Sequence, residues 1–155
     1  MGVEIERKFL VKNAAWRQSV ESSESILQGY LAETGRVTVR VRLKGERGFL
    51  TIKGASVGIS RTELEYEIPA DEARLMLDQL TSLPVIDKVR HRVRVGAHLW
   101  EVDVFAGENA GLVLAELELT AEDEAFERPD WVGAEVSDDP RYFNLNLARQ
   151  PFRRW

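Results

Sequence analysis

The sequence predicts an α+β fold built from antiparallel strands that are joined mostly by hairpins, with helices between or after them. Three observations support this prediction. Apolar and polar residues alternate in seven separate segments, helical periodicity is confined to a few short stretches, and several strands carry like charges along one face. Neither an internal repeat nor a linker-like change of composition is visible. We therefore expect residues 1–155 to form one domain.

Alternation with a period of two places charged side chains on one face of each predicted strand and apolar side chains on the other. In the first strand, residues 3–11, Glu4, Glu6 and Lys8 share a face. The other predicted strands span 36–44, 49–54, 60–68, 85–95, 100–105 and 112–120. The basic rows comprise Arg36, Arg40, Arg42, Lys44, Lys53, Lys88, Arg90, Arg92 and Arg94. The acidic rows comprise Glu63, Glu65, Glu67, Glu101, Asp103, Glu116 and Glu118, with Arg61 at the start of the 60–68 strand.

Three helices are predicted. Residues 71–80 begin with acidic side chains, which are favourable at a helix N-terminus, and carry an apolar stripe. Thr120 is a candidate cap for a helix over 121–127, with Asp123 at the reciprocal capping position. A last helix is predicted over 139–147, because a proline in its first turn is well tolerated.

Composition and charge exclude several classes of protein. The chain has no cysteine, which rules out disulfides, thiolate metal ligands and a cysteine nucleophile, and a cytoplasmic location follows by default. No apolar run approaches the roughly 18–20 residues that span a bilayer, and no secretory signal is visible, so we expect no membrane partner. The net charge of −5 argues against nucleic acid as a partner.

Two interpretations of the charged faces are open. On a single strand, such a face is usually the solvated side of a sheet. Rows of one sign repel, however, unless opposite rows face them or multivalent ligands neutralise them, and the interior of a barrel that holds a polyanion and divalent cations provides both. Lys and Arg neutralise a triphosphate, and carboxylates bind Mg²⁺ or Mn²⁺. Acidic side chains at i and i+2 lie about 6–7 Å apart, which is close enough to share one metal.

The segment Glu4-Ile5-Glu6-Arg7-Lys8 resembles the ExExK signature of the CYTH superfamily, the triphosphate tunnel metalloenzymes. Further matches follow in the order of the family and cover nearly the whole chain. They are Arg40-Val41-Arg42, Thr51-Ile52-Lys53, the 61–67 run, Lys88-Val89-Arg90, residues 101–105 and Glu116-Leu117-Glu118. Residues 28–31 resemble the second strand of the family, and 139–147 resemble its C-terminal helix.

The resemblance implies an eight-stranded antiparallel barrel with a few flanking helices, whose lumen accepts the triphosphate lengthwise. It implies that Glu4, Glu6, Glu116 and Glu118 hold Mg²⁺ or Mn²⁺, with Glu63 and Glu65 as further acidic residues of the lumen. The implied phosphate ligands are Lys8, Arg40, Arg42, Lys53, Lys88 and Arg90, with Arg141 closing over the substrate. Asp103 would help to place a second metal or its water, so the implied catalytic set is Lys8, Glu4, Glu6 and Asp103.

Two placements stay open. The acidic pair of the 60–68 strand is either Glu63 with Glu65 or Glu65 with Glu67. The side chains of Arg92 and Arg94 extend the basic row to the mouth of the tunnel or into solvent.

The expected function is metal-dependent hydrolysis of a triphosphate. We favour inorganic tripolyphosphate, cleaved to pyrophosphate and phosphate, because no cluster that would recognise a nucleobase is visible; Trp16, Trp100, Trp131 and Trp155 are interpreted as core or surface residues. His91 and His98 are interpreted as structural. The alternatives are an adenylate cyclase, a thiamine or nucleoside triphosphatase, a non-catalytic polyphosphate-binding or nucleotide-binding module, and a β-sandwich with solvated faces. A homodimer is the expected oligomer.

Overall fold

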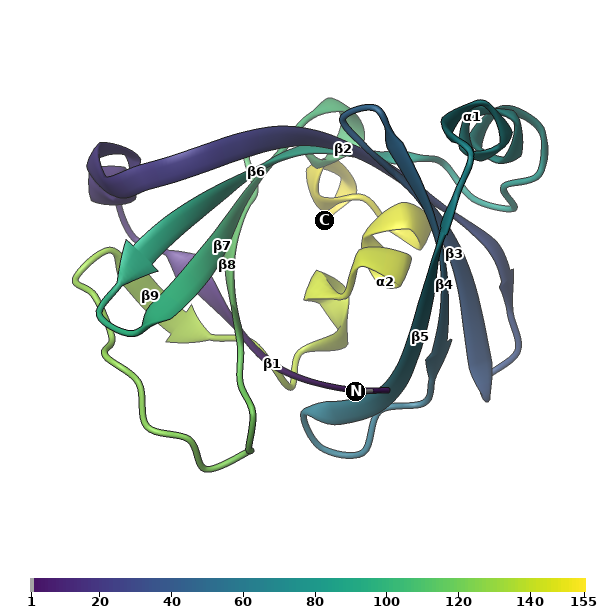
Figure 1. Ribbon diagram of the computed structural model, residues 1–155. Helices are drawn as coiled ribbons and strands as arrows, with labels where there is room; N and C mark the ends of the chain where they lie inside the picture. Colours follow the sequence, from purple (N-terminus) through teal and green to yellow (C-terminus); the bar gives the residue numbers. More distant parts are fainter. Residues whose placement is uncertain (1) are drawn as a thin grey trace.

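The protein is a closed antiparallel barrel, seen along its opening in Figure 1; the computed structural model describes residues 2–155. The hydrogen-bonded order is β5-β4-β3-β2-β6-β7-β8-β1-β9, and β5 also pairs with β1. That last pairing closes eight strands into a ring, and β9 is added at the side of β1. The eight-stranded barrel predicted from the sequence is thus confirmed. The strands are β1 (Val3–Val11), β2 (Val20–Glu33), β3 (Val37–Lys44), β4 (Arg47–Gly54), β5 (Ser60–Ile68), β6 (Ile86–Val95), β7 (His98–Phe105), β8 (Val113–Glu118) and β9 (Val132–Glu135).

Strand β1 closes the ring because it changes partner along its length. Its first part pairs with β5 over Val3–Ile5, and its later part pairs with β8 over Glu6–Leu10. Glu4, Glu6 and Lys8 of β1 face the lumen, whereas Arg7 points the other way and pairs with Glu135 of β9.

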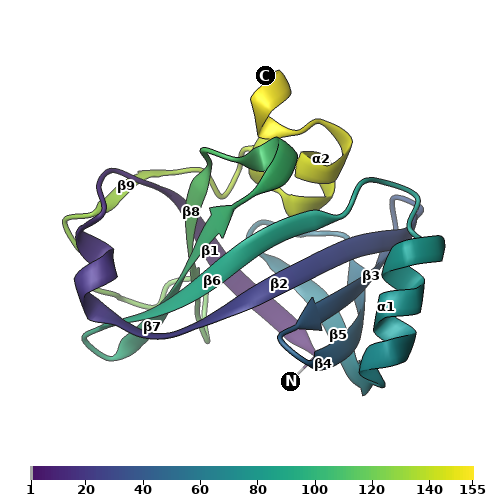
Figure 2. The same ribbon diagram turned by 90° about the horizontal axis from the view of Figure 1, so that it is seen from above.

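The apolar core lies outside the barrel, since the inward faces are charged. One cluster packs the outer face of β1, β6, β7 and β8 against β9 and the helix η1 (Ala15–Ser19), with Trp16, Trp100 and Trp131 buried in it. A second cluster joins the barrel end to α2 (Asn144–Arg149), and a third joins β3 to α1 (Ala70–Gln79). Figure 2 shows α2 over one end of the barrel and α1 against its side. The remaining short helices are η2 (Gly107–Asn109), η3 (Pro140–Tyr142) and η4 (Phe152–Arg154).

The seven predicted strands are confirmed with small shifts at their ends, and the helix predicted over 71–80 is observed as α1. The sequence missed β9, which has four residues, and most of β2, in which Ser22 and Ser23 interrupt the alternation. The helix predicted over 139–147 is divided into η3 and α2. None of the helices within residues 2–155 is long and apolar enough to cross a membrane.

The predicted helix over 121–127 is wrong, because this segment is irregular. Thr120 caps no helix there. Its backbone N–H and its hydroxyl both donate to the carboxylate of Glu124 at 2.6 Å, and Nε2 of His98 contacts the same carboxylate at 2.6 Å. Glu124, and not Asp123, is therefore the partner of Thr120, and the contact with β7 fixes the segment as a loop.

Candidate functional site

A cavity of about 280 Å³ occupies the lumen of the barrel. Its wall is formed mainly by charged side chains that the alternation of the strands directs inward, and one part of it is formed by the C-terminal segment. The charged lining residues are Glu4, Glu6, Lys8, Arg40, Arg42, Lys44, Lys53, Arg61, Glu63, Glu65, Arg90, Glu101, Glu116 and Glu118. Ser137, Phe143, Asn144, Leu145 and Asn146 line it from the C-terminal segment. The charged faces are thus not the solvated side of a sandwich.

Most of the cations of the lumen are buried. Lys8, Arg40 and Lys53 each expose 5–6% of their surface. Removing a cation from water is costly unless an anion or hydrogen-bond acceptor replaces the water, so these side chains need partners within the lumen.

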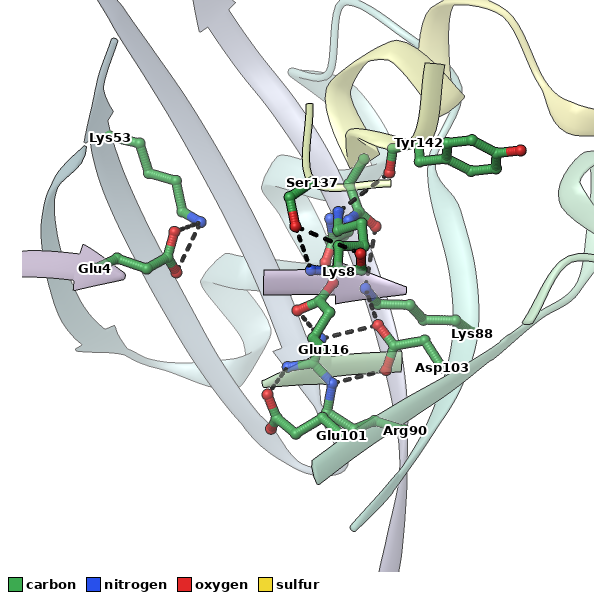
Figure 3. A network of polar contacts seen from close by, with 12 residues as sticks. Glu4, Lys8, Lys53, Lys88, Arg90, Glu101, Asp103, Glu116, Ser137 and Tyr142 are labelled. Atoms are coloured by element: carbon green, nitrogen blue, oxygen red, sulfur yellow. Dashed lines mark hydrogen bonds and ion pairs between the residues drawn. The ribbon is translucent and has the colours of Figure 1, made fainter. Parts of the chain in front are cut away.

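Arg90, on β6, is held by the carboxylate of Asp103, on β7. Nε and Nη2 of Arg90 donate to the two oxygens of Asp103 at 2.8 Å each, and Nζ of Lys88 lies 2.7 Å from the same carboxylate (Figure 3). Burial raises the pKa of Asp103, but the charges of Arg90 and Lys88 outweigh it and hold that pKa far below its usual value. Asp103 and Lys88 are fully buried and do not line the cavity, so they contact Arg90 and the C-terminal segment instead.

Lys8 and Lys88 are tied to the C-terminal segment. Nζ of Lys8 donates to the carbonyl of Tyr142 at 3.1 Å and lies 3.6 Å from the carboxylate of Glu116 (Figure 3). Nζ of Lys88 donates to Oδ1 of Asn144 at 3.0 Å. The segment that leads into α2 therefore covers one end of the lumen through hydrogen bonds to residues of the site.

Four carboxylates gather where β1 meets β8. Glu6 pairs across the strands with Glu118, and Lys8 pairs with Glu116. Burial, together with the charges of Glu116 and Glu4, raises the pKa of Glu6 to about 8. Burial and the charges of Glu4, Glu101 and Glu116 also raise the pKa of Glu118. Carboxylate oxygens are the ligands that hard divalent cations prefer, and a bound cation would relieve the repulsion within this acidic set.

The same acidic set is partly neutralised by neighbouring cations. Glu4 lies 3.2 Å from Nζ of Lys53 and 3.2 Å from Nε of Arg61. Burial raises the pKa of Glu4, yet the hydrogen bond with Glu63 and these two cations outweigh that effect and lower it. Within residues 2–155, no three acidic or histidine side chains are close enough to coordinate one ion in this arrangement.

The geometry bears on both open placements. Glu63 and Glu65 both line the cavity, with Glu63 3.3 Å from Lys53 and Glu65 3.6 Å from Arg40. Glu67 pairs instead with Arg47 outside the lumen at 2.7 Å. Neither Arg92 nor Arg94 lines the cavity; they pair with Glu24 and Glu21 at 2.9 and 3.3 Å.

Arg141 does not reach the cavity in this structure. Its guanidinium donates to the carboxylate of Asp139, at 2.7 Å for the shortest contact, and lies over the ring of Trp155. The structure thus brings together all of the predicted site residues except Arg141, with Lys88 and Asp103 lying behind the wall. It adds Lys44, Arg61 and Glu101, which belong to the charged faces predicted from the alternation. It also adds Tyr30, which lines the cavity, and Gln28, which is fully buried behind Arg42; neither carries a charge that would mark it in the sequence.

The interpretations of the histidines and tryptophans fit this geometry. His91 contacts Ser23 and the ring of Trp16, and His98 contacts Glu124. Neither histidine lines the cavity, nor does any tryptophan. Within residues 2–155, its aromatic lining residues are Tyr30 and Phe143.

The family model described as the CYTH domain matches residues 2–149. This chain belongs to the CYTH family. An inorganic triphosphatase of Acetivibrio thermocellus is 47% identical to this CYTH protein over 155 residues, which cover 100% of this chain and 99% of that protein. An inorganic triphosphatase of Nitrosomonas europaea is 38% identical over 149 residues, which cover 94% and 96% of the two chains.

Solved structures support the same assignment. The crystal structure of an inorganic triphosphatase superposes on this CYTH protein with a TM-score of 0.68 and 35% identity, covering 94% of this chain and 93% of the other. A protein of Pyrococcus horikoshii superposes with a TM-score of 0.61 and 19% identity, covering 77% and 80%, and so shares the fold. Membership of the family, which the order of motifs predicts, is confirmed.

Proposed function

We propose that this protein is a metal-dependent triphosphatase that hydrolyses inorganic tripolyphosphate to pyrophosphate and phosphate. The observation that carries the proposal is a barrel lumen in which buried cations, among them Lys8, Arg40 and Lys53, share one cavity with the carboxylates of β1, β5 and β8. Proteins similar over the full length of the chain are inorganic triphosphatases, which supports the same reaction.

The cations of the lumen supply the phosphate-binding groups. Arg40, Arg42 and Arg90 present guanidinium groups that can grip two oxygens at once, and Lys8 and Lys53 add point charges. Binding a polyanion would release Lys53 from Glu4 and Lys8 from Glu116, because phosphate oxygens compete for the same ammonium groups. Catalysis by such a site is mainly positioning and neutralisation of charge in the transition state.

The carboxylates supply the metal-binding groups. Glu4, Glu6, Glu116 and Glu118 would hold Mg²⁺ or Mn²⁺, with Glu63 and Glu65 as further acidic residues. The bound metal supplies neutralisation of phosphate charge and activation of the attacking water. In a module that only bound anions, these carboxylates would lower the affinity for the anion by repulsion. Their presence therefore favours an enzyme.

Inorganic tripolyphosphate is favoured over organic triphosphates by the lining of the cavity. A nucleobase needs an apolar or aromatic pocket that stacks on it. Two aromatic side chains among the lining residues, Tyr30 and Phe143, lie in a wall that is otherwise mainly charged. An adenylate cyclase or a thiamine or nucleoside triphosphatase would use the same charged groups and is the alternative.

The test is phosphate release from equal concentrations of tripolyphosphate, ATP and thiamine triphosphate, each with Mg²⁺, Mn²⁺ or EDTA, with cyclic AMP assayed in the ATP reactions. We expect metal-dependent release mainly from tripolyphosphate. Cyclic AMP would move the protein to the cyclases, and binding without turnover of any substrate would favour the non-catalytic module.

We also propose a cytoplasmic location, which the absence of cysteine supports, and a homodimer. The homodimer is supported by apolar side chains on the outer face of β1 and β5, where Val3, Leu64 and Tyr66 are 60%, 44% and 56% exposed. Light scattering after size-exclusion chromatography tests the oligomer, and cell fractionation tests the location.

A further inference from the structure

Arg42 is a cation of the lumen whose side-chain partner is neutral. Its Nε and Nη2 donate to Oε1 of Gln28 at 3.0 and 2.7 Å. Within residues 2–155, no carboxylate forms an ion pair with Arg42. Arg90, by contrast, is fixed by the carboxylate of Asp103, and Lys53 lies between those of Glu4 and Glu63.

The unpaired charge of Arg42 is costly to the free protein. The side chain is buried, and its burial and the charges of Arg40 and Arg90 lower the pKa of Arg42 to about 9. A buried guanidinium is normally paired with a carboxylate. An amide partner orients the guanidinium by hydrogen bonding but does not neutralise its positive charge, so that charge can still bind an anion.

Gln28 is well placed for this role. It is fully buried on β2, directly across from Arg42 on β3. Its Nε2 donates to the hydroxyl of Tyr30 at 3.1 Å, on the side of the amide away from Oε1. The opposite amide orientation would place N–H groups against the N–H groups of Arg42, so the guanidinium itself fixes the acceptor orientation, and the hydroxyl of Tyr30 accepts from the amide nitrogen.

We propose that Gln28 is a positioning residue that directs Arg42 into the lumen while leaving its positive charge for a phosphate group of the substrate. A guanidinium has five N–H donors, and two of them are taken by Gln28, so three remain for phosphate oxygens. This inference rests on the proposed triphosphatase function and adds a residue to it that carries no charge.

The test is the isosteric variant Gln28→Glu. Its carboxylate can accept the same two hydrogen bonds from Arg42 and one from the hydroxyl of Tyr30, which is also a donor, so the geometry of the contact is retained. Only the charge changes. We expect the KM for tripolyphosphate, and its Kd measured by calorimetry in EDTA, to rise at least about tenfold, with a smaller change in kcat.

The matched control is Gln79→Glu, which adds the same charge on the exposed end of α1, outside the lumen. It should leave KM and kcat unchanged. An unchanged KM and Kd in Gln28→Glu, or a loss confined to kcat, would overturn the inference. Absence of tripolyphosphate binding and turnover in the unaltered protein would instead overturn the proposed function, so the two failures are distinguishable.

A second measurement does not depend on the folding of a variant. In NMR spectra of the unaltered protein in EDTA, the Nε–H of Arg42 should exchange slowly with solvent because Gln28 accepts from it. Adding tripolyphosphate should shift the Nη signals of Arg42 much more than its Nε signal. Arg42 signals that do not respond to saturating tripolyphosphate would contradict the inference.

Discussion

Lys8 combines two roles that conflict in most proteins, since its ammonium group is buried and yet must meet an incoming anion. Nζ lies 3.6 Å from Glu116 and 3.1 Å from the carbonyl of Tyr142. Both partners are weaker competitors for an ammonium group than a bound triphosphate would be. The ammonium group of Lys8 is therefore hydrogen-bonded in the free protein and can still exchange these partners for phosphate oxygens of the substrate.

We predict that Lys8→Ala lowers the turnover of tripolyphosphate at least about 100-fold, because it removes a positioned charge from the reacting region. The circular dichroism spectrum should be unchanged, since the backbone pairing of β1 does not depend on this side chain. Lys12→Ala, an exposed change just beyond the end of β1, is the control and should keep full activity. Retained turnover in Lys8→Ala would contradict the role.

Glu6 gives a prediction for stability against pH. Its pKa is raised from 4.5 to about 8, so between these values the folded protein binds more protons than the unfolded chain. The contribution of Glu6 to stability is therefore complete below about pH 4.5 and is lost as the pH rises toward 8. Glu6→Gln should raise the Tm in EDTA at pH 8 by roughly 2–4 °C or more.

The gain should shrink as the pH approaches 4.5, and metal-dependent turnover should be lost. Scanning calorimetry at pH 5 and pH 8 measures the first effect and phosphate release the second. Glu127→Gln, on an exposed loop, should change neither. A Tm difference that is the same at both pH values would show that the charge of Glu6 is not the cause.

At the scale of single residues, alternation predicts which charged side chains point inward, because a strand has only two faces and one of them lines the lumen. It does not predict whether an inward-pointing side chain reaches the cavity or is buried behind its wall. Asp103 and Lys88 share their faces with residues that reach the cavity, yet both are buried behind its wall. Gln28 was missed for a related reason, since a neutral amide gives no charge signal. The side chain of Arg141 is held away from the cavity by Asp139 and Trp155, and the alternation of strands gives no information on a residue of a short helix.

Among the elements, α1 shows how a sequence position fixes the docking of a helix. Gly48 on β4 lies directly beneath it, and a Cβ added there would come within 2.7 Å of Cβ of Ala73 and 3.1 Å of the carbonyl of Ile68. Two small residues therefore set how closely the helix approaches the barrel. The added Cβ would meet a Cβ and a backbone carbonyl, whose positions are fixed by the backbone, so a change of side-chain rotamer cannot relieve the clash.

We predict that Gly48→Ala lowers stability by about 1–3 kcal/mol, because α1 must shift outward. The KM and kcat for tripolyphosphate should stay near those of the unaltered protein, since α1 does not line the cavity. Gly54→Ala on the same strand is the control, as its Cβ would meet Thr62 at an ordinary 3.5 Å. Equal denaturation midpoints for the two variants would contradict this account of the docking.

Local sequence patterns predict an element correctly where neighbouring residues determine its structure. They fail where a contact with a residue distant in the sequence determines it. The strands and α1 follow from periodicity, and their existence is confirmed. The 121–127 segment carries a reasonable capping pattern, but His98, on β7, shares the carboxylate of Glu124 with Thr120. No local pattern in the sequence contains that tertiary contact.

The molecule as a whole reverses the usual arrangement of a small barrel, with its charge inside and its core clusters outside. The lumen then opposes folding through desolvation, and the outer clusters with the backbone pairing must compensate. Closure is the weakest part of that pairing, because β1 meets β5 only over Val3–Ile5, whereas β2 pairs with β6 from Val20 to Gln28. Substrate and metal would contact both sides of this seam, through Glu4 on β1 and Glu63 on β5.

Amide hydrogen exchange should therefore be fastest, among the barrel strands, along the β1–β5 seam, since short pairings open at low free energy. Tripolyphosphate together with Ca²⁺, chosen as an oxygen-seeking cation that need not support turnover, should slow exchange at the seam more than along β2 and β6, because a ligand stabilises the closed state to which it binds. The Glu4→Gln variant retains the backbone pairing but weakens the contacts of this side chain with Lys53 and Arg61 and loses one ligand-binding charge. Its seam should exchange no more slowly than before without ligand and should gain less protection with it. Equal protection of all barrel strands, with and without ligand, would mean that the ring opens only in global unfolding and that the lumen is loaded through its open end without any movement of the seam.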